Sequence, residues 1–491
     1  MLFVNLFNAL IRLKKRIENI IDPKIVCPCC FKRDSWRNCL FRSSNPTLYP
    51  DVAYTKYKEG NASAAVNSQT PSAVDNDMSG YKGVGGGLIN QNAGNTLMMK
   101  KVLDPKDFAS KDKITGKWFS VAGIKEDGIV TREKICTKCH HFLPEDGGKI
   151  ISIIGPRSAG KTVFFIKLIN YIEKNSDKLD MDVSFYALDD YSRPCFTIMK
   201  KQLLNEEITP DDMENAGRLG ITITKPKDGG IETTPPKYIR PILIRLEKRS
   251  NRKGITLCLY DFPGEKGNDP VYQNNLAIHM KYADAFFIVT DPFSLIPNIN
   301  SVLPDGFSEA IQLKNTIDSS FIEQFYTNSM RSAEGILENV ATAVLNGKTY
   351  TDESKQIKRP AAFIFTKCDQ FPYALVKLAE AECEKPIISP DDKALFSCSE
   401  PKDYIDLDKV NVNSKKIKKF VKKYNEAFEH AVNSRYDNYK YFMVSSTGAN
   451  LLHGMQQAIA NEINIEKPLM WILSQFDIVE GRQGDNSSEK R

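Results

Sequence analysis

Long apolar runs are absent from this sequence of 491 residues, since nothing in it approaches the roughly 18 consecutive apolar side chains of a membrane-spanning helix. The order of a secretory signal peptide is also absent, because the basic cluster Lys14-Lys15-Arg16 follows the N-terminal apolar stretch instead of preceding it. Histidine is scarce, with five residues, and no Ser-His-Asp or His-Glu-x-x-His grouping stands out. We therefore expect a cytoplasmic protein whose cysteines stay reduced, without a histidine-based active site.

An excess of one charge sign is also small, since 67 Lys and Arg residues stand against 61 Asp and Glu residues, for a net charge of +6. Such a balance neither requires nor excludes an anionic partner. The hydrophobic content of 41% is sufficient for one large domain and a small one.

Residues 1–22 predict an amphipathic helix, because large apolar side chains recur at helical spacing over residues 2–21 and basic residues fill the other side. Two interpretations of this helix stay open. It packs on its own protein or on a partner chain, or it lies on a membrane surface, which would make the protein peripheral to the membrane.

The rest of the chain divides into a small domain, a large domain and a tail. Residues 23–146 contain a low-complexity insertion at about 58–100, where large apolar side chains are too few to offset the ordering entropy. Residues 147–478 form the large domain, and the polar residues 479–491 are expected to be a disordered tail.

Short apolar runs alternate with longer helical stretches from Lys149 onward. The runs are Ile150–Ile154, Ile242–Leu246, Ile255–Tyr260, Ala285–Val289, Ala361–Phe365 and Tyr441–Val444. This pattern predicts an α/β fold with a mostly parallel sheet of six strands and helices on both faces. The second and third runs alternate with period two across a short polar turn, so they predict an antiparallel hairpin that puts one reversed strand at the sheet edge.

A phosphate-binding loop follows the first of these runs. Gly155-Pro156-Arg157-Ser158-Ala159-Gly160-Lys161-Thr162 stands between a predicted strand and a predicted helix, which is the context that a P-loop requires. Side chains must be absent at two of its positions, Gly155 and Gly160, so that backbone N–H groups can surround a triphosphate. Lys161 supplies a charge to the outer phosphates, and the Thr162 hydroxyl is expected to bind Mg²⁺. The loop residues expected on the nucleotide are Gly155, Ser158, Ala159, Gly160 and Lys161.

A second motif, expected near Mg²⁺, follows the strand Ile255–Tyr260. Asp261 ends this strand and is expected to reach Mg²⁺, and Gly264 is expected to offer its N–H to the γ-phosphate. The D-x-x-G pattern is weak alone, but it stands after the right strand and in the right order.

Two further segments indicate the base. Thr366-Lys367-Cys368-Asp369 follows the strand Ala361–Phe365, and the Asp369 carboxylate can accept two parallel N–H bonds from guanine, whereas adenine has no such pair of donors. The Lys367 stem can lie over the base plane. Ser445 and Ser446 follow the last strand, in a turn that can present N–H groups to guanine O6.

Taken in order, these motifs resemble those of the Ras-like, translation-factor-related class of P-loop GTPases, over about residues 149–475. The resemblance implies GTP and GDP as ligands, Mg²⁺ as cofactor, and a switch threonine just before the hairpin. Thr233 and Thr234 stand in the matching place, and we prefer Thr234; an ordinary loop bounded by prolines is the alternative.

The catalytic residues are expected to be Lys161, Thr234, Glu265 and Arg157, and two of them depart from the class. Glu265 stands where many members have Gln, and its charge opposes the phosphate oxygens, so intrinsic hydrolysis is expected to be low. Arg157 lies inside the phosphate loop, where we interpret it as an internal arginine finger. The leading hypothesis is a GTP-hydrolysing molecular switch. The alternatives are a GTP sensor with little hydrolysis and a nucleic-acid-associated ATPase, and Asp369 argues against the latter.

Two C-x-x-C pairs predict a structural zinc site in the small domain. Cys27 and Cys30 form one pair, and Cys136 and Cys139 form the other, which together supply four thiolates for tetrahedral Zn²⁺. The long separation is explained by the low-complexity insertion, since loop-closure entropy grows slowly with length. Cys29 and Cys39 leave the ligand set open, and unrelated reduced cysteines or a redox pair are the alternative.

With this ribbon before the phosphate loop, the chain resembles a bacterial zinc-ribbon GTPase family, sometimes called double-GTPases. Tyr260-Asp-Phe-Pro-Gly-Glu265, Asp291-Pro292 and Pro468-Leu-Met-Trp471 add to the resemblance, which implies a role in bacterial conflict and defence. Protein partners are expected at the switch regions and at insertions near 176–232, 295–358 and 371–438. A lysine run at 415–423 more often marks a solvated helix face than a nucleic-acid or lipid contact, so we do not expect nucleic acid as a partner.

Overall fold

The computed structural model describes the chain in separate ranges. They are residues 24–35, 40–41, 109–111, 118–120, 124–126, 129–131, 134–136, 138–139, 141–144, 146–156, 159–186, 191–204, 206–213, 241–261, 278–296, 335, 337–338, 340–345, 356–369, 371–446 and 462–483. The chain divides into two compact units, Met1–Gly148 and Lys149–Arg491. The predicted helix at 2–21 and the low-complexity segment at 58–100 lie outside the described residues.

The described part of unit 1 contains short antiparallel strand pairs. They are β1 (Lys24–Val26) with β2 (Arg33–Ser35), β3 (Leu40–Phe41) with β8 (Lys134–Ile135), β4 (Ala109–Lys111) with β5 (Trp118–Ser120), and β6 (Ile124–Glu126) with β7 (Ile129–Thr131). The pair β3–β8 joins residues about a hundred positions apart, with Leu40 opposite Ile135. This pairing brings the N-terminal part of the unit to its C-terminal part, as the predicted zinc ribbon requires.

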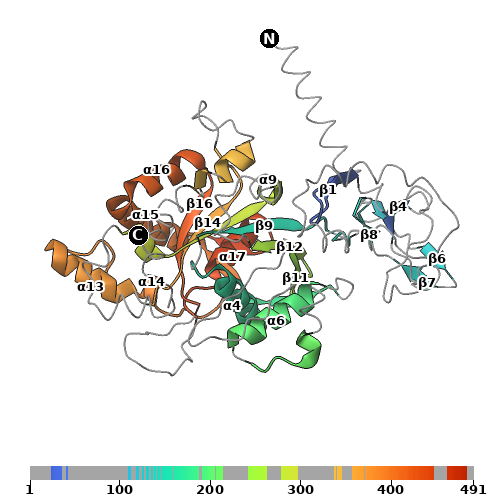
Figure 1. Ribbon diagram of the computed structural model, residues 1–491, viewed down its shortest axis with the longest axis horizontal. Helices are drawn as coiled ribbons and strands as arrows, with labels where there is room; N and C mark the ends of the chain where they lie inside the picture. Colours follow the sequence, from blue (N-terminus) through green and yellow to red (C-terminus); the bar gives the residue numbers. More distant parts are fainter. Residues whose placement is uncertain are drawn as a thin grey trace, which may run out of the picture. The chain divides into compact units, whose positions relative to one another are not determined.

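Unit 2 is built on one sheet of seven strands in the order β10-β11-β12-β9-β13-β14-β16. Figure 1 labels β9, β11, β12, β14 and β16 of this sheet. The strands are β9 (Lys149–Ile154), β10 (Met181–Phe185), β11 (Ile242–Lys248), β12 (Gly254–Asp261), β13 (Ala285–Thr290), β14 (Ala361–Phe365) and β16 (Tyr439–Met443). The five strands from β12 to β16 in this order are parallel, and β11 runs antiparallel to both of its neighbours. The prediction of a mostly parallel α/β sheet is therefore confirmed.

The predicted count of six strands is wrong, because β10 adds a seventh at the edge. The reversed strand of the hairpin, β11, is consequently second from the edge instead of at it. Asp180 adopts a left-handed backbone (φ 52°) just before β10, and its carboxylate accepts a hydrogen bond from Ser250 N in the β11–β12 turn at 3.1 Å. This local turn aligns the short strand with β11, so that Phe185 lies opposite Ile244.

Helices cover both faces of the sheet, as predicted. The helices are α4 (Lys161–Lys174), α5 (Ser176–Leu179), α6 (Ser192–Leu204), α9 (Ile278–Tyr282), α13 (Phe371–Glu382), α14 (Lys393–Phe396), α15 (Leu407–Tyr424), α16 (Glu426–Arg435) and α17 (Lys467–Gln475). Side chains of α4, α6 and α17 share one core cluster with alternate strand residues such as Ile153, Phe287 and Ile364. On the other face, the Phe363 ring meets Phe428 of α16 edge-on at 6.2 Å. The alternation along β9, β13 and β14 thus gives each strand two buried faces.

The predicted insertion at 371–438 contains helices, and the predicted tail differs from the structure at its start. Helices α13 to α16 occupy the predicted insertion between β14 and β16, where α15 packs on the sheet and the Ser414 hydroxyl accepts a hydrogen bond from Tyr441 N. The predicted tail begins too early, since Val479 is buried and β17 (Glu480–Arg482) pairs with β15 (Tyr404–Asp406). None of the described helices combines the length and the apolar character that crossing a membrane requires.

Candidate nucleotide site and cysteine cluster

The predicted phosphate loop connects β9 to α4. Its lysine is buried, and the Lys161 ammonium donates hydrogen bonds to the carbonyl oxygens of Gly155 at 3.0 Å and Pro156 at 2.8 Å. Thr162 follows as the second residue of α4 and is half-buried. The loop therefore places an ammonium group and the N-terminus of a 14-residue helix together, which is an arrangement that favours an anion.

Two glycines are required by the shape of this loop. A Cβ atom on Gly155 would lie 2.0 Å from the carbonyl oxygen of Val289 in β13, so the backbones of loop and strand approach too closely for any other residue. Gly160 has a left-handed backbone with φ +79°, which an L side chain rarely adopts. Phosphate access alone predicts glycine at both positions, and the packing against β13 is a second reason for Gly155.

The other predicted segments follow neighbouring parallel strands. Asp261 ends β12, Asp291 follows β13, Thr366 follows β14 and Ser445 lies two residues beyond β16. Because the carboxyl ends of parallel strands lie at one edge of a sheet, these segments share that edge with Gly155 after β9. The order of the sheet places β9 between β12 and β13, with β14 and β16 beyond β13. After β9, the chain forms β10, β11 and β12 on one side of β9 and then crosses to β13 on the other side. Open α/β sheets bind ligands at such a switch point.

Thr366 connects the predicted base segment to the phosphate loop. Its hydroxyl donates a hydrogen bond to the carbonyl oxygen of Ala159 at 2.9 Å, and its backbone N–H donates to Thr290 O at 3.1 Å. Both Thr366 and Ala159 are buried. The two halves of the predicted site are thus in direct contact.

Lys367 is held in an uncommon conformation. Its backbone is left-handed with φ 58°, and its ammonium donates to Asp291 Oδ2 at 2.5 Å. Asp291 also accepts the N–H of Phe293 at 3.0 Å through Oδ1, which caps the short 3₁₀ helix η4 (Pro292–Leu295). Lys367 is therefore fixed between β13 and β14 by an ion pair that the sequence motifs did not predict.

Asp369 presents a buried carboxylate. Its Oδ1 accepts the Ser445 hydroxyl at 2.5 Å, whereas its Oδ2 is buried and accepts no hydrogen bond from any residue within the described ranges. Burial raises the pKa of this carboxyl above its usual range, against the opposing effects of the Ser445 hydroxyl and the Lys367 charge. A buried acceptor without a partner costs free energy, on the order of 1–3 kcal/mol, unless a ligand supplies the missing donor.

Ser445 and Ser446 form the second predicted base segment. Ser445 exchanges backbone hydrogen bonds with Ile463 at 3.0 and 2.9 Å, and both serines are buried. The N–H of Cys368 donates to Val444 O at 3.1 Å, which joins the two base segments side by side.

Several predicted residues cannot be placed. Arg157, Ser158, Thr233, Thr234, Gly264 and Glu265 lie outside the described residues, and only the backbone of Asp261 is described. The roles predicted for these residues therefore stay predictions: an arginine finger, a switch threonine, the second switch and a carboxylate that orients water.

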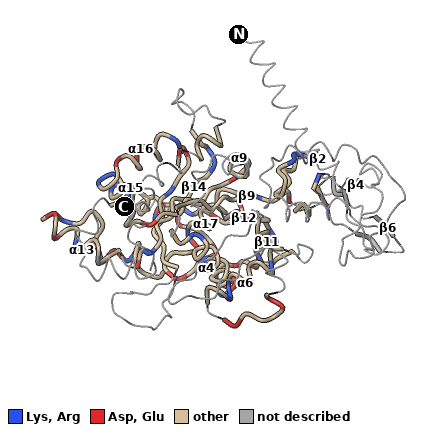
Figure 2. Tube along the Cα trace, viewed as in Figure 1, with Lys and Arg blue, Asp and Glu red and all other residues tan. Residues whose placement is uncertain are grey.

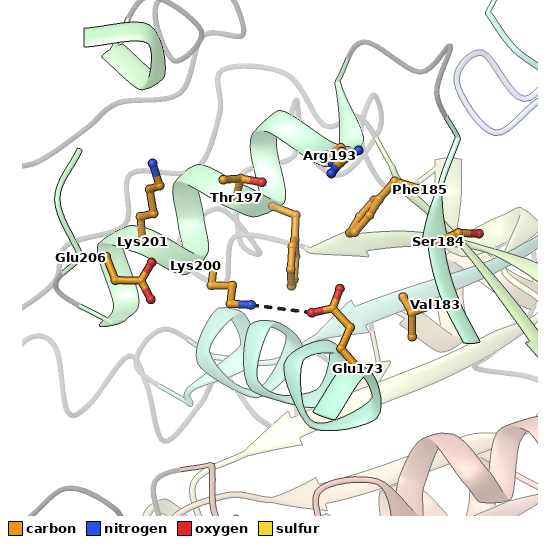
Figure 3. Close-up of a pocket in the computed structure, with 10 residues that line it drawn as sticks. Glu173, Val183, Ser184, Phe185, Arg193, Thr197, Lys200, Lys201 and Glu206 are labelled. Atoms are coloured by element: carbon orange, nitrogen blue, oxygen red, sulfur yellow. Dashed lines mark ion pairs between the residues drawn. The ribbon is translucent and has the colours of Figure 1, made fainter. Parts of the chain in front are cut away.

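A cavity of about 480 Å³ opens elsewhere in unit 2, between α4, β10 and α6 (Figure 3). Val183, Phe185 and Phe196 form its apolar lining, and an ion pair of 3.6 Å joins Lys200 to Glu173 across it. Glu173 lies twelve residues beyond Lys161 on α4, which is roughly 18 Å along the helix axis. The cavity contains none of the predicted nucleotide-site residues and is separate from that site.

In unit 1, the four predicted cysteines come together. The Sγ atoms of Cys27 and Cys139 are 3.5 Å apart, those of Cys30 and Cys136 are also 3.5 Å apart, and all four lie within 4.8 Å of one another. A disulfide would require about 2.05 Å, so the sulfurs are not bonded. Four sulfurs about 2.3 Å from one tetrahedral metal ion would be about 3.8 Å apart. The cluster therefore fits a metal ion bound by four thiolates.

Both cysteine pairs have the same local geometry. Cys27 N donates to Lys32 O and Cys136 N donates to His141 O, each at 2.9 Å. Within each turn, an amide two residues beyond the first cysteine points at its sulfur, from Cys29 at 3.4 Å and from Lys138 at 3.3 Å. Such N–H···S bonds stabilise thiolate charge and orient the ligands.

The ligand set contains no fifth group in the described part of unit 1. Cys29 contributes its amide, and its side chain is not among the clustered sulfurs, while Cys39 lies outside the described residues. Burial raises the pKa of the Cys27 and Cys139 thiols, and hydrogen bonds from Cys139 and Cys27 lower the pKa of Cys136. Four thiols so close together, three of them buried, are chemically consistent with a shared cation.

Helix α15 carries the predicted lysine run, and its basic positions are coloured blue along the trace in Figure 2. Three lysines of the run form ion pairs with acidic residues of unit 2. Lys416 pairs with Asp392 at 2.6 Å, Lys418 with Glu429 at 3.2 Å, and Lys423 with Glu382 and Glu384 at 2.5 and 2.8 Å. Ile417, Phe420 and Val421 are buried on the opposite side of the helix. This geometry is that of a solvated helix face over a core.

Comparisons with known proteins add little to this geometry. No protein-family model matches the chain, and none of the curated proteins does. Among solved structures, the chain is similar to the GTPase-like domain of Ski7 from S. cerevisiae, bound to GTP in one structure and to GDP and inorganic phosphate in another. The identity is 12% and the TM-score 0.26, over 67% of this chain and 50% of that one. This chain thus spans about half the length of its neighbour.

Proposed function

We propose that unit 2 binds guanine nucleotides at the edge formed by the phosphate loop, Thr366 to Asp369 and Ser445. The observation that carries the proposal is the buried Asp369 Oδ2, which accepts no hydrogen bond from the described residues. Asp369 follows Thr366 by three residues, and the Thr366 hydroxyl donates a hydrogen bond to Ala159 in the phosphate loop.

Guanine matches this carboxylate better than adenine does. Guanine N1–H and N2–H are adjacent donors that point the same way, so the two Asp369 oxygens can accept both. Adenine has an unprotonated ring nitrogen at the corresponding position, and its lone pair would face the carboxylate. A site whose buried polar group is left unpaired rejects the wrong ligand strongly.

The phosphates would bind at the turn between β9 and α4. Lys161 would exchange its two carbonyl partners for phosphate oxygens, and the amides at the start of α4 would donate to the same group. Thr162 and Asp261 would hold Mg²⁺, which supplies charge neutralisation at the β- and γ-phosphates.

We further propose that unit 2 is a molecular switch that hydrolyses GTP, with the segments around Thr234 and Gly264 ordered while GTP is bound. A GTP sensor with little hydrolysis is the second candidate, and Glu265 in place of a neutral side chain favours it. In unit 1, we propose that the four cysteines hold Zn²⁺, since a filled tetrahedral set of thiolates suits a structural zinc ion. Protein partners would bind the switch segments and the insertions.

Calorimetric titration of the full chain with GTP, GDP and ATP in the presence of Mg²⁺ tests the first proposal. GTP and GDP are expected to bind at least about a hundredfold more tightly than ATP, because ATP would leave Asp369 unpaired. Equal affinity for GTP and ATP would overturn the assignment. Single-turnover measurements with bound GTP then separate the switch, which releases phosphate, from the sensor, which retains GTP.

A further inference from the structure

Asp291 occupies a junction between two adjacent strands of the sheet. Thr290, the last residue of β13, is in register with Phe365, the last residue of β14. The residues that follow, Asp291 and Thr366-Lys367, are therefore neighbours, and the Thr366 N–H bond to Thr290 O fixes their separation. Asp291 is close to the predicted base segment although it is 76 residues from Lys367 in the chain.

The Asp291–Lys367 pair is partly shielded from solvent. The side chains are 17% and 33% exposed, and the oxygen–nitrogen distance is 2.5 Å. Lys367 also has the left-handed backbone, a conformation that persists in a residue other than glycine only where the surroundings determine it. Thr366 on one side and the ion pair on the other provide that determination.

The alternative partner for the Lys367 ammonium is the carboxylate that guanine needs. Asp369 lies two residues further along, and the Lys367 charge already acts on it, lowering its pKa against the effect of burial. If the ammonium moved from Asp291 to Asp369, it would occupy an acceptor that the base requires. Asp291 holds the ammonium at the end of β13 and thereby leaves Asp369 Oδ2 to the nucleotide.

We propose that Asp291 is a positioning residue for guanine selectivity, which acts by holding Lys367 away from Asp369 without touching the base itself. The proposal rests on the guanine site described above. It adds a residue that would determine how strongly GTP is preferred over ATP.

A double-mutant cycle tests this role. Asp291→Asn keeps a side chain that caps η4, since Asn is as good a cap as Asp, but it removes the charge that holds Lys367. Lys367→Met keeps the length and apolar character of the stem and removes the ammonium. GTP and ATP affinities are measured for the wild type, the two single variants and the double variant, together with thermal unfolding of each.

Asp291→Asn is expected to weaken GTP binding about fivefold, the size typical of a partly exposed ion pair, with ATP binding unchanged. In the Lys367→Met background, the same substitution is expected to have no further effect on GTP binding. A purely structural role for Asp291 would instead reduce both affinities, and equally in both backgrounds, which overturns the proposal.

A replacement variant and the wild-type preference for GTP separate a failure of the Asp291 role from a failure of the guanine site. If Asp291→Asn does not fold, Asp291→Ser replaces it, because serine also caps a helix and cannot pair with Lys367. Wild-type protein that prefers GTP but shows an additive cycle overturns only the role of Asp291. Wild-type protein that does not prefer GTP over ATP overturns the guanine site and this role together.

Discussion

The Thr366 hydroxyl at the end of β14 donates a hydrogen bond to the carbonyl oxygen of Ala159 in the phosphate loop, 2.9 Å away. The two residues are 207 positions apart in the sequence. This bond directly connects the segment expected to recognise the base with the loop expected to hold the phosphates. Nucleotide affinity should therefore depend on a contact that touches neither the base nor the phosphates.

Thr366→Val tests this connection. Valine has nearly the shape of threonine but lacks the hydroxyl, so the buried Ala159 oxygen loses its donor at a cost of about 1 kcal/mol, or about fivefold in GTP affinity. Titration of the variant with GTP measures the loss. Thr366→Ser keeps the hydroxyl and should bind like the wild type. Wild-type affinity in the valine variant would show that the bond does not contribute.

Gly155→Ala should be more damaging than Gly160→Ala. The added Cβ at Gly155 would meet Val289 O at 2.0 Å, and overpacking of this kind costs about 3 kcal/mol. At Gly160 the nearest atoms of Thr366 are 3.8 Å away, so only the left-handed backbone is penalised, by about 1–2 kcal/mol. Denaturant unfolding of both variants compares the two free energies. The reverse order would contradict the close approach of the loop to β13.

The affinity for GTP should rise with pH through the range in which Asp369 ionises. Burial raises the pKa of Asp369 in the free protein, and two N–H donors from guanine would stabilise its charged form and lower that pKa. Binding then releases a proton below the raised pKa of the free protein, so affinity increases as pH rises and levels off above that pKa. Calorimetry in buffers of different ionisation enthalpy measures this release. Proton uptake on binding would contradict the account.

The same shift has a consequence for the ligand-free protein. Because the pKa of Asp369 is higher in the folded than in the unfolded state, its contribution to stability is present at low pH and is lost as pH rises through the folded-state value. Asp369→Asn should remove this loss, and the free energy of unfolding of the two proteins should diverge with increasing pH.

Purified full-length protein should contain one zinc ion per chain. Cys136→Ser removes one of the four clustered sulfurs and should reduce the zinc content well below one, together with the thermal stability of unit 1. Cys398→Ser, at an exposed cysteine in unit 2, is the matched control and should retain the metal. Elemental analysis measures both, and wild-type protein without zinc would end the metal assignment.

Local sequence patterns were sufficient for most of the sheet and for the cysteine pairs. Five-residue apolar runs such as Ala361–Phe365 are buried on both faces, and such runs have few alternatives to a central parallel strand. The C-x-x-C spacing is a local signal, so the sequence predicted Cys27, Cys30, Cys136 and Cys139 as one group, although it left Cys29 and Cys39 open as ligands.

Features that depend on strand order could not be predicted. Lys367 pairs with Asp291 because β13 and β14 are neighbours in the sheet. No residue near either one in the sequence indicates that these two strands pair. Asp291 lies two residues beyond the predicted strand Ala285–Val289, and this position near a strand end was the available signal. The edge strand Met181–Phe185 was missed because it is short and only Met181 is fully buried.

The central claim is that Asp369 recognises guanine, and nucleotide selectivity in Asp369→Asn tests it most directly. Asparagine presents an N–H donor beside one acceptor, so it should bind GTP at least about tenfold more weakly and accept xanthosine triphosphate, whose ring offers an oxygen in place of the guanine amino group. Asp211→Asn makes the same change at an exposed site and should leave selectivity intact. A loss of GTP with a gain of xanthosine triphosphate is the predicted result; unchanged preference for GTP in Asp369→Asn would contradict it.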